Sequence, residues 1–588
     1  MLSSRWPAAA SAHATAVERR DLRLHAKAVP QRTLLERAAS LVSLRDRMRS
    51  GRRRDAVTQA IRRFMVCVNE LGDFDALPDL DGLPEAGSAE LGDGDITTAA
   101  DHGIVETDSD SAGSDRIGRL KPARPHLLRV FTTGEHQRSQ KARRRWVSHP
   151  PAFNAFVEER RGASFPDGVT LPGHEIHARV AHFGHAKCLD LAFAFAQFLL
   201  PRRWRRRHTF VHDGKVWRQR IIPTGGSNSS QLCQEFLLSV ALYVVDSLEG
   251  SGPEVDADVY IDNVRFLSSS LAMVDRAVEL FYSTCAELAI GINEVKQVVL
   301  DDAGTTYDFL GVHYDHCALT TSLAQKSHTS LRALMGRLET MSTAEWEAST
   351  VRQLLSALGI LQHGSIVLRK SRAPYYGVMK FFRRRASQGA LLDGPARPWG
   401  ALRHHMLEWC REVGGASETA VRRHWRGRTH DLRRAVLYTD ASDGGYGAIL
   451  FPDDGSCSII AGRWSTAEIG AHINLKEAWA LHYALVRLDL RGIHELEVRV
   501  DNTSVMYTVT GGSSKAFELN AAVGAIWALP QHALITSLSY VRSELNRSDF
   551  LSRLAPRRAF GARSNNPLAA SAMERGVIDE RCMILQWW

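Results

Sequence analysis

The last third of the chain carries acidic residues at positions that the surrounding apolar pattern predicts to be buried. One predicted strand ends at Asp440, and another is followed directly by Asp501. A predicted helix that begins at Asn474 places Glu477 on the same apolar stripe as Leu481. Because a buried carboxylate costs free energy unless it is protonated, paired or bound to a cation, this block has to fold so that something compensates these charges.

A fourth acid, Asp549, stands where a further helical pattern begins. Four carboxylates of this kind suit a pair of Mg²⁺ ions, one to activate water and one to stabilise the leaving oxygen of a phosphodiester. Taken singly, each acid is more often a solvated surface charge. The interpretation therefore depends on the four acids together, in their order along the chain, rather than on any one of them.

The length of 588 residues predicts several domains, because one hydrophobic core stops growing near roughly 250 to 300 residues. No uncharged apolar run approaches the roughly 20 residues needed to cross a bilayer, which excludes an integral membrane protein. A net charge of +9 favours polyanionic partners. Eight scattered cysteines without a C-x-x-C pair favour a reduced, intracellular protein of the cytoplasm or nucleus that is not secreted.

The chain before residue 119 divides by composition into two parts. Residues 1–72 are rich in arginine and carry apolar positions at helical spacing, which predicts a basic, partly helical region. Residues 73–115 contain many acids and neither lysine nor arginine. Since such a stretch has little apolar surface to bury, we expect a disordered acidic linker over 73–118.

A second pair of acids lies between Leu120 and Leu323, where short strands alternate with helices. The segment 257–267 alternates like a β-hairpin with Asp262 and Asn263 at its tip, since both residue types tolerate positive φ. Asp190 stands alone in an apolar run. It either caps a helix or joins Asp262 in a shared cleft.

Three further features accompany these acids. A glycine loop over 222–230 precedes an apolar helix, although surface turns use the same residues. The arginines of 202–207 are candidates for phosphate contacts. Downstream, the residues from 327 to about 429 read as mostly helical, and Ser342 with Glu345 has the spacing of a capping box.

Four segments of the C-terminal block resemble, in order, the motifs of retroelement RNase H domains: LYTDASDGGYGAIL, INLKEAWALHYAL, VRVDNTSV and ELNRSDFLSR. The resemblance implies that the substrate is the RNA strand of an RNA–DNA hybrid. It also implies the metal ligands, which are Asp440, Glu477, Asp501 and Asp549. Some relatives carry a histidine before the last aspartate, whereas residues 540–544 contain none, so that Arg542 or water would serve instead.

Five segments resemble the successive palm motifs of retroelement reverse transcriptases: CLDLAFAFAQ, IIPTGGSNSSQLCQEF, VYIDNVRF, INEVKQVVL and FLGV. The resemblance implies that Asp190 and Asp262 hold the metal ions beside Asn263. It makes Phe195 the aromatic gate against a ribose 2′-hydroxyl. It makes Lys296 the proton donor to pyrophosphate, although an ordinary surface lysine is equally expected at that position. The remaining implied substrate contacts are Gly225, Arg145 and Lys141.

The hairpin departs from the family pattern. Reverse transcriptases usually carry two adjacent aspartates where this chain has Asp262-Asn263. Asparagine keeps an oxygen ligand but loses a charge, which is expected to weaken metal binding or shift the preferred metal. The Tyr-Ile-Asp-Asn form and the ELNRSDFLSR ending most resemble the DIRS-type, tyrosine-recombinase retroelements, which include the VIPER elements.

Together these patterns predict an α+β right-hand polymerase followed by an α/β RNase H-like domain. We expect fingers and palm over 119–326, a helical thumb and connection over 327–429, the RNase H-like domain over 430–555 and a tail over 556–588. The resemblance implies an RNA-directed DNA polymerase with RNase H activity that uses two Mg²⁺ or Mn²⁺ ions in each site. Its partners would be RNA template, DNA primer, RNA–DNA hybrid, dNTPs and other retroelement proteins. The alternative is an inactive remnant that only binds nucleic acid, and an RNA-templated RNA polymerase is disfavoured by Phe195 and by the nuclease.

Overall fold

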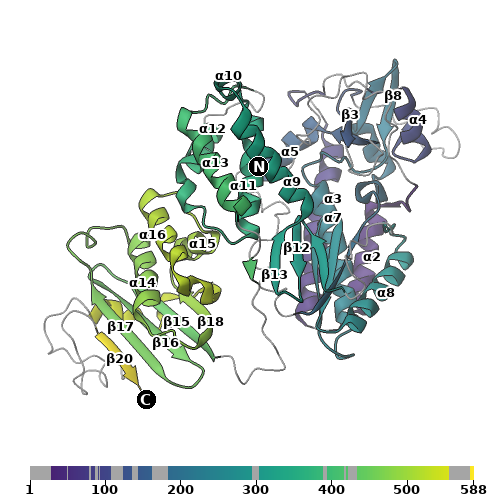
Figure 1. The fold of residues 1–588 in the computed structure, drawn as a ribbon. Coiled ribbons are helices and arrows are strands. Elements are labelled where there is room, and N and C mark those ends of the chain that lie inside the picture. The colour runs from purple at the N-terminus through teal and green to yellow at the C-terminus, as the bar shows by residue number, and fades with distance from the viewer. Residues whose placement is uncertain are drawn as a thin grey trace. The chain divides into compact units, whose positions relative to one another are not determined.

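The computed structural model (Figure 1) describes residues 28–49, 51–78, 81–86, 91, 93–107, 124–135, 143–161, 183–293, 304–387, 394–415, 419–420, 433–554 and 583–587. The fold is mixed α and β. The chain divides into two compact units, residues 1–320 and residues 321–588. Among the described residues, no helix combines the length and the apolarity that a bilayer crossing requires.

An antiparallel sheet of three strands forms the centre of the first unit, in the order β5 (His185–Asp190), β10 (Asn263–Ser268), β9 (Val255–Tyr260). Helix α7 (Ser229–Ser247) packs on β9, and helix α8 (Leu271–Glu287) packs on β5 and β10. Apolar residues of both helices and of the sheet bury one another in a single core. This arrangement places the C-terminal end of β5 beside the β9–β10 turn.

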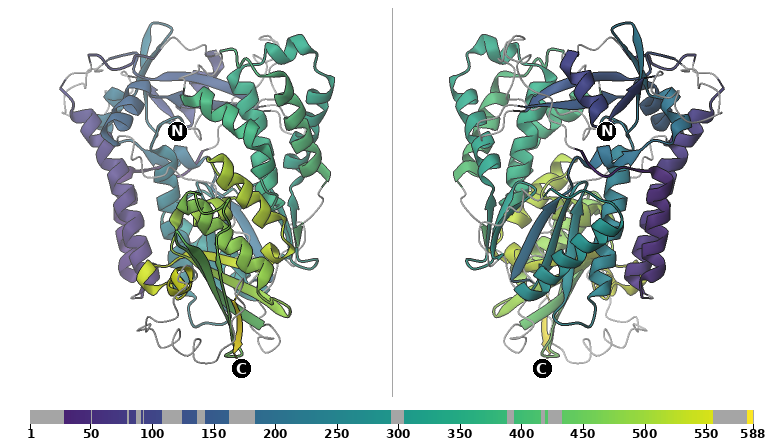
Figure 2. Two further views of the ribbon diagram at one scale, coloured as in Figure 1. Left: turned by 90° about the vertical axis from the view of Figure 1, so that its left-hand side faces the viewer. Right: turned by 90° about the vertical axis from the view of Figure 1, so that its right-hand side faces the viewer.

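The N-terminal helices α2 (Leu34–Arg47) and α3 (Arg52–Ala76) belong to that same core. Helix α2 starts with a capping box in which Thr33 and Glu36 satisfy each other's backbone N–H groups. The long α3, purple in Figure 2, packs along α7 through fully buried residues such as Phe64. The expected boundary at 72 falls inside α3, and the apolar stripes of α2 and α3 pack directly on α7, so these helices belong to the core rather than to a separate region. The expected boundary at 118 lies outside the described residues.

Arg37 shows how a basic residue of this region is used inside the protein. Its side chain is fully buried and donates to the carbonyl oxygens of Leu288 (2.7 Å), Gln197 (3.1 Å) and Ala289 (3.0 Å). Its guanidinium also lies over the ring of Phe198 at 5.6 Å. Burial lowers the pKa of Arg37 to about 10, so it still carries its charge at neutral pH.

The prediction of a disordered linker over 73–118 is wrong for two elements within it. These are α4 (Asp93–Asp101) and β2 (Val105–Thr107), and β2 pairs with β8 (Lys215–Gln219). Ile96 and Ile104 are buried in a small apolar cluster that the acidic composition obscures. Several other residues of that range lie outside the described part of the chain.

The acids of this stretch pair with the arginines of η4 (Arg202–Arg207). Arg205 donates to Glu106 at 2.8 Å, and Arg206 donates to Asp75 at 2.9 Å. Arg207 is buried and donates to the carbonyl oxygen of Asp75 at 3.2 Å. For Arg205 and Arg207, which are buried, the expectation of phosphate contacts is therefore wrong, because internal acids and carbonyls take their donors.

The first unit also contains smaller sheets and short helices. A parallel pair joins β1 (Arg32–Thr33) to β6 (Phe198–Leu199), and an antiparallel pair joins β3 to β4. The other bounds are β3 (Arg129–Glu135), β4 (Arg143–His149), α5 (Pro151–Arg161), η3 (Ala194–Gln197), β7 (Thr209–His212), β11 (Thr306–Phe309) and β12 (Val312–Asp315). Strand β13 (Thr320–Leu323) spans the sequence position at which the two units are divided.

The second unit begins with helices that share a core of their own. Ser342 and Glu345 form the predicted capping box. At the centre, Trp409 stacks on Tyr375 with ring centroids 4.5 Å apart and donates to Ser365 Oγ at 2.7 Å. The bounds are α9 (Gln325–Thr340), α10 (Thr343–Glu347), α11 (Val351–Val367), η6 (Ala373–Tyr375), α12 (Tyr376–Ser387), α13 (Gly400–Gly415) and β14 (Thr419–Ala420).

A six-stranded sheet follows in the order β19-β18-β15-β16-β17-β20. The strands β15, β18 and β19 are parallel, whereas β16, β17 and β20 pair antiparallel. Their bounds are β15 (Arg433–Ala441), β16 (Gly445–Pro452), β17 (Cys457–Arg463), β18 (Ile493–Val500), β19 (Ile535–Tyr540) and β20 (Met583–Trp587). Strand β20 lies within the range expected to be a tail.

Helices cover both faces of this sheet. Residues Ala448 and Leu450 of β16 share a core with α14, whereas Ile449 between them packs with Leu551 of α17 on the opposite face. Side chains that alternate along a strand point to opposite faces, so α14 and α17 lie on different sides. The bounds are α14 (Ile473–Arg487), α15 (Thr503–Gly511), α16 (Phe517–Ala528), η7 (Pro530–Leu534), η8 (Ser543–Leu545) and α17 (Asp549–Leu554).

Candidate active sites

Three acids gather near the C-terminal ends of the neighbouring strands β15 and β18. Asp440, Glu477 and Asp501 each offer an oxygen, and these oxygens lie within 4.8 Å of one another. The register explains the meeting, because Thr439 of β15 pairs with Val500 of the parallel β18, and the next residue of each chain segment is the aspartate. Glu477 comes from α14, which packs on β15.

Asp549, the fourth predicted acid, is the first residue of α17. It is not one of the three acids that lie within 4.8 Å of one another. Its Oδ1 accepts from Arg553 Nη2 at 2.7 Å and from Nε at 3.1 Å. Its negative charge nevertheless contributes to raising the pKa of both Asp440 and Glu477.

Two polar residues that sequence reasoning missed hold the acids in place. Asn546 is buried and donates to Asp440 Oδ1 at 3.1 Å and to the carbonyl oxygen of Thr439 at 3.0 Å. Ser543 Oγ donates to Asp501 Oδ2 at 2.7 Å. Their positions could have indicated this role, because Asn546 lies within the motif ELNRSDFLSR and Ser543 directly precedes it.

The cluster is electrostatically costly as it stands. Burial raises the pKa of Glu477 to about 9, helped by the charges of Asp440 and Asp501. Burial also raises the pKa of Asp440 to about 7, against a hydrogen bond from Ser552. Within the described part of the chain, Glu477 Oε2 is buried without a hydrogen-bond partner. An unpartnered carboxylate oxygen among like charges fits a divalent cation, since hard cations take oxygen ligands.

These shifts predict how stability depends on pH. A carboxyl whose folded-state pKa is raised stabilises the fold below its unfolded pKa and loses that contribution as the pH rises through the folded value. In EDTA, the free energy of unfolding is therefore expected to fall by roughly 2 kcal/mol or more between pH 4.5 and pH 9 through Glu477. Urea unfolding at several pH values measures it, with Glu477→Gln as the matched control. An equal slope in both proteins would contradict the assignment.

The first unit brings a second set of predicted residues together. Strand β5 pairs with β10 so that Asp190 lies opposite Asn263, and the N–H of Leu191 donates to the carbonyl oxygen of Asp262 at 2.8 Å. Asp190 is 9% exposed. Its Oδ2 accepts from Asn293 Nδ2 at 3.4 Å. Asp190 therefore ends a strand, which removes the alternative that it caps a helix.

The turn between β9 and β10 consists of Ile261 and Asp262, because β10 already begins at Asn263. The expectation of positive φ at the Asp-Asn pair is wrong, since Ile261 has φ of +56°. A β-branched residue in this region costs roughly 1–3 kcal/mol. Gln234 of α7 holds the strained turn: it accepts from the N–H of Ile261 at 2.7 Å and donates to the carbonyl oxygen of Val259 at 3.2 Å. Sequence reasoning missed this glutamine.

The other predicted residues lie on separate elements. Phe195 is half-buried on η3 against the core. Gly225 donates to the carbonyl oxygen of Ser148 at 2.7 Å, and a Cβ there would lie 2.9 Å from that same oxygen, so the close approach requires glycine. Arg145 is exposed on β4 opposite Thr133. Lys141 and Lys296 lie outside the described residues.

Comparison with known proteins adds one family match. Residues 434–550, which are less than half of the chain, match the family described as "Reverse transcriptase-like", and this region is RNase H-like. No curated protein matches the chain. Among solved structures, the foamy viral protease–reverse transcriptase dRH in complex with double-stranded DNA is 12% identical, with a TM-score of 0.42 over 88% of this chain and 83% of that chain. The foamy viral protease–reverse transcriptase in complex with RNA/DNA hybrid is 12% identical, with a TM-score of 0.41 over 92% and 67%.

Proposed function

We propose that the chain is a retroelement RNA-directed DNA polymerase with RNase H activity, which copies RNA into DNA and degrades the RNA of the hybrid. The observation that carries the proposal is the convergence of Asp440, Glu477 and Asp501 within 4.8 Å. It is supported by the family match over the same residues. The neighbouring placement of Asp190 and Asp262 supports the polymerase half.

In the RNase H half, Asp440, Glu477, Asp501 and Asp549 would hold two divalent cations, Mg²⁺ or Mn²⁺. When bound, such ions polarise the scissile phosphodiester and make the attacking oxygen more acidic. The chain's own residues keep the ligands in position: Asn546 orients Asp440, and Ser543 orients Asp501. Arg542 is exposed in the loop before α17, and we propose that it, or water, serves in place of the histidine that some relatives carry there.

In the polymerase half, the β5-β10-β9 sheet with α7 and α8 would be the palm, and the β3–β4 hairpin with α5 the fingers. Helices α9 to α13 would be the thumb and connection. Asp190, Asp262 and Asn263 would hold the same kind of cation pair. We further propose that Phe195 selects deoxynucleotides and that Gly225, Arg145 and Lys141 contact the incoming dNTP, with Lys296 as proton donor.

The Asp-Asn hairpin leads to a specific expectation. Asn263→Asp is expected to preserve primer extension or raise it by up to roughly tenfold in Mg²⁺, because it adds a charged oxygen ligand beside Asp262. Extension rates over a range of Mg²⁺ and Mn²⁺ concentrations measure the change. The variant should need less Mg²⁺ for half-maximal rate, and a complete loss of extension would speak against the assignment of this turn.

The DIRS-type subgroup is also a proposal. It is supported by the Tyr260-to-Asn263 sequence of the turn and by the segment that ends at Arg553. Other proteins of the same element, a recombinase among them, would then be partners. Co-expression with a DIRS-type recombinase and co-purification tests this point, and recovery of the chain alone would argue against a stable complex.

The deciding experiment for the whole proposal is incorporation of dTTP on poly(rA)–oligo(dT), run beside cleavage of a labelled RNA–DNA hybrid. Both activities are expected in Mg²⁺ or Mn²⁺, and neither in EDTA. The remnant alternative, which Asn263 favours, predicts hybrid binding with steep salt dependence and no incorporation. Incorporation of ribonucleotides in preference to dNTPs would overturn the role of Phe195.

A further inference from the structure

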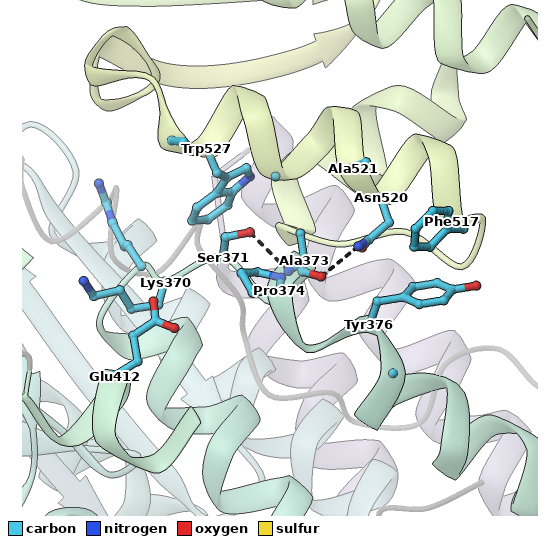
Figure 3. A pocket seen from close by; sticks show the side chains of 14 residues that line it. Lys370, Ser371, Ala373, Pro374, Tyr376, Glu412, Phe517, Asn520, Ala521 and Trp527 are labelled. Atoms are coloured by element: carbon cyan, nitrogen blue, oxygen red, sulfur yellow. Dashed lines mark hydrogen bonds between the residues drawn. The ribbon is translucent and has the colours of Figure 1, made fainter. Parts of the chain in front are cut away.

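A pocket of about 790 Å³ opens in the second unit between the N-terminal part of α12 and helix α16 (Figure 3). Its walls are fixed by hydrogen bonds. Asn520 of α16 donates to the carbonyl oxygen of Ala373 at 2.8 Å, and Arg372 Nε donates to the carbonyl oxygen of Gly511 at 3.1 Å. Ser371 also donates to the carbonyl oxygen of Gly512 at 3.2 Å. These hydrogen bonds hold the segments that form the pocket in fixed positions.

Three aromatic side chains line the pocket: Tyr376, Phe517 and Trp527. Phe517 is 68% exposed, and its ring meets Tyr376 edge to face with centroids 5.5 Å apart. Tyr376 is oriented by its hydroxyl, which donates to the carbonyl oxygen of Lys515 at 3.2 Å. An aromatic ring held in place while most of its surface faces water offers a stacking platform.

Positive charge surrounds this platform. Residues 369–385 contain seven lysines and arginines and no acid. Arg369 and Lys370 line the pocket, and on α12 the cations of Lys380 and Arg383 lie over the Tyr376 ring at 5.8 Å and 5.5 Å. Among the described residues that line the pocket, Glu412 is the one acid, and it accepts from the Tyr375 hydroxyl at 2.6 Å. The net field therefore favours an anionic ligand.

We propose that this aromatic–cationic pocket binds single-stranded nucleic acid, with an unpaired base against Tyr376 and Phe517 and the adjoining phosphates against Lys380 and Arg383. Cations alone would accept any polyanion. The exposed ring can stack on the flat face of an unpaired base. A duplex does not offer that face, because its bases stack on one another. The pocket shares no residue with either acid cluster, and the proposal assigns it no bond-breaking step.

The test uses the full-length chain in EDTA, so that neither cleavage nor extension intervenes and an inactive enzyme would not alter the result. Fluorescence anisotropy compares labelled oligo(dT) with an abasic oligonucleotide of equal length. Phe517→Ser is expected to weaken oligo(dT) binding roughly five- to tenfold and to leave the abasic strand within about twofold, since one stacked base contributes that much. The paired change Lys380→Glu with Arg383→Glu should weaken both ligands and flatten their salt dependence.

Matched controls are available in the same unit. Tyr507 is 71% exposed on α15 and Arg332 is exposed on α9, so Tyr507→Ser and Arg332→Glu should change binding by less than about twofold. An oligonucleotide carrying 4-thiothymidine should cross-link to peptides that contain residue 376 or 517, as located by mass spectrometry. Cross-links confined to other peptides would overturn the proposal. So would unchanged oligo(dT) affinity in Phe517→Ser, or equal competition by duplex or by poly-glutamate.

Discussion

Asp440→Asn is expected to lower the rate of hybrid cleavage by about a thousandfold or more, while primer extension stays within about twofold of the wild type. The reason is geometric and electrostatic. Asp440 is 3% exposed, and one of its carboxylate oxygens lies within 4.8 Å of an oxygen of Glu477 and an oxygen of Asp501. The substitution keeps the shape of the side chain and removes one of the charges that a bound cation needs. Gel analysis of a labelled RNA–DNA hybrid measures cleavage.

A second readout separates loss of cation binding from loss of folding. Because Asp440 is buried among like charges, its neutralisation should raise the melting temperature in EDTA by a few degrees. The rise that Mg²⁺ causes in the wild type should then shrink. Asp443→Asn is the control, since Asp443 lies three residues away with an exposed side chain, and an asparagine oxygen can still accept the hydrogen bond from Lys476 Nζ at 3.4 Å. Loss of cleavage in both variants would contradict a site centred on Asp440.

Alternation along the strands and the apolar stripe of α14 made much of this site predictable. The predicted strand that ends at Asp440 corresponds to β15, and the helix predicted from Asn474 begins at Ile473. Periodicity identifies such elements because side chains repeat every second residue in a strand and about every 3.6 in a helix. That β15 and β18 are parallel neighbours is a long-range fact, and only the resemblance to known motifs indicated it.

Contacts between distant charges were beyond the reach of composition. The stretch around Asp75 and Glu106 was expected to be disordered because it has little apolar surface to bury, but Arg206 and Arg205, which lie 131 and 99 residues later in the chain, pair with these two acids. The sequence marked Arg37 only as one arginine of a basic, partly helical region, although it is buried and hydrogen-bonded to three carbonyl groups. The local sequence shows where charged residues stand, whereas the partner of each charge depends on the fold.

Asp190→Asn is expected to abolish primer extension, with a loss of about a thousandfold or more, and to leave hybrid cleavage within about twofold of the wild type. Asp190 is buried at the end of β5, opposite Asn263 and next to the backbone of Asp262. Since Asn263 is already neutral, the proposed site holds only two charged ligands among these three residues. Removing one of them leaves a single carboxylate, which is too weak a set for two divalent cations.

The control is Asp256→Asn on β9, which removes an acid from the far end of the same hairpin. Its side chain accepts from the N–H of Ala257 at 2.8 Å, and an asparagine oxygen preserves that hydrogen bond. Incorporation of dTTP on poly(rA)–oligo(dT) should therefore survive in Asp256→Asn and vanish in Asp190→Asn. Cleavage by Asp190→Asn shows that the second unit is folded. The two acid clusters belong to different units, so we expect them to act independently. Loss of both activities from Asp190→Asn would contradict that expectation.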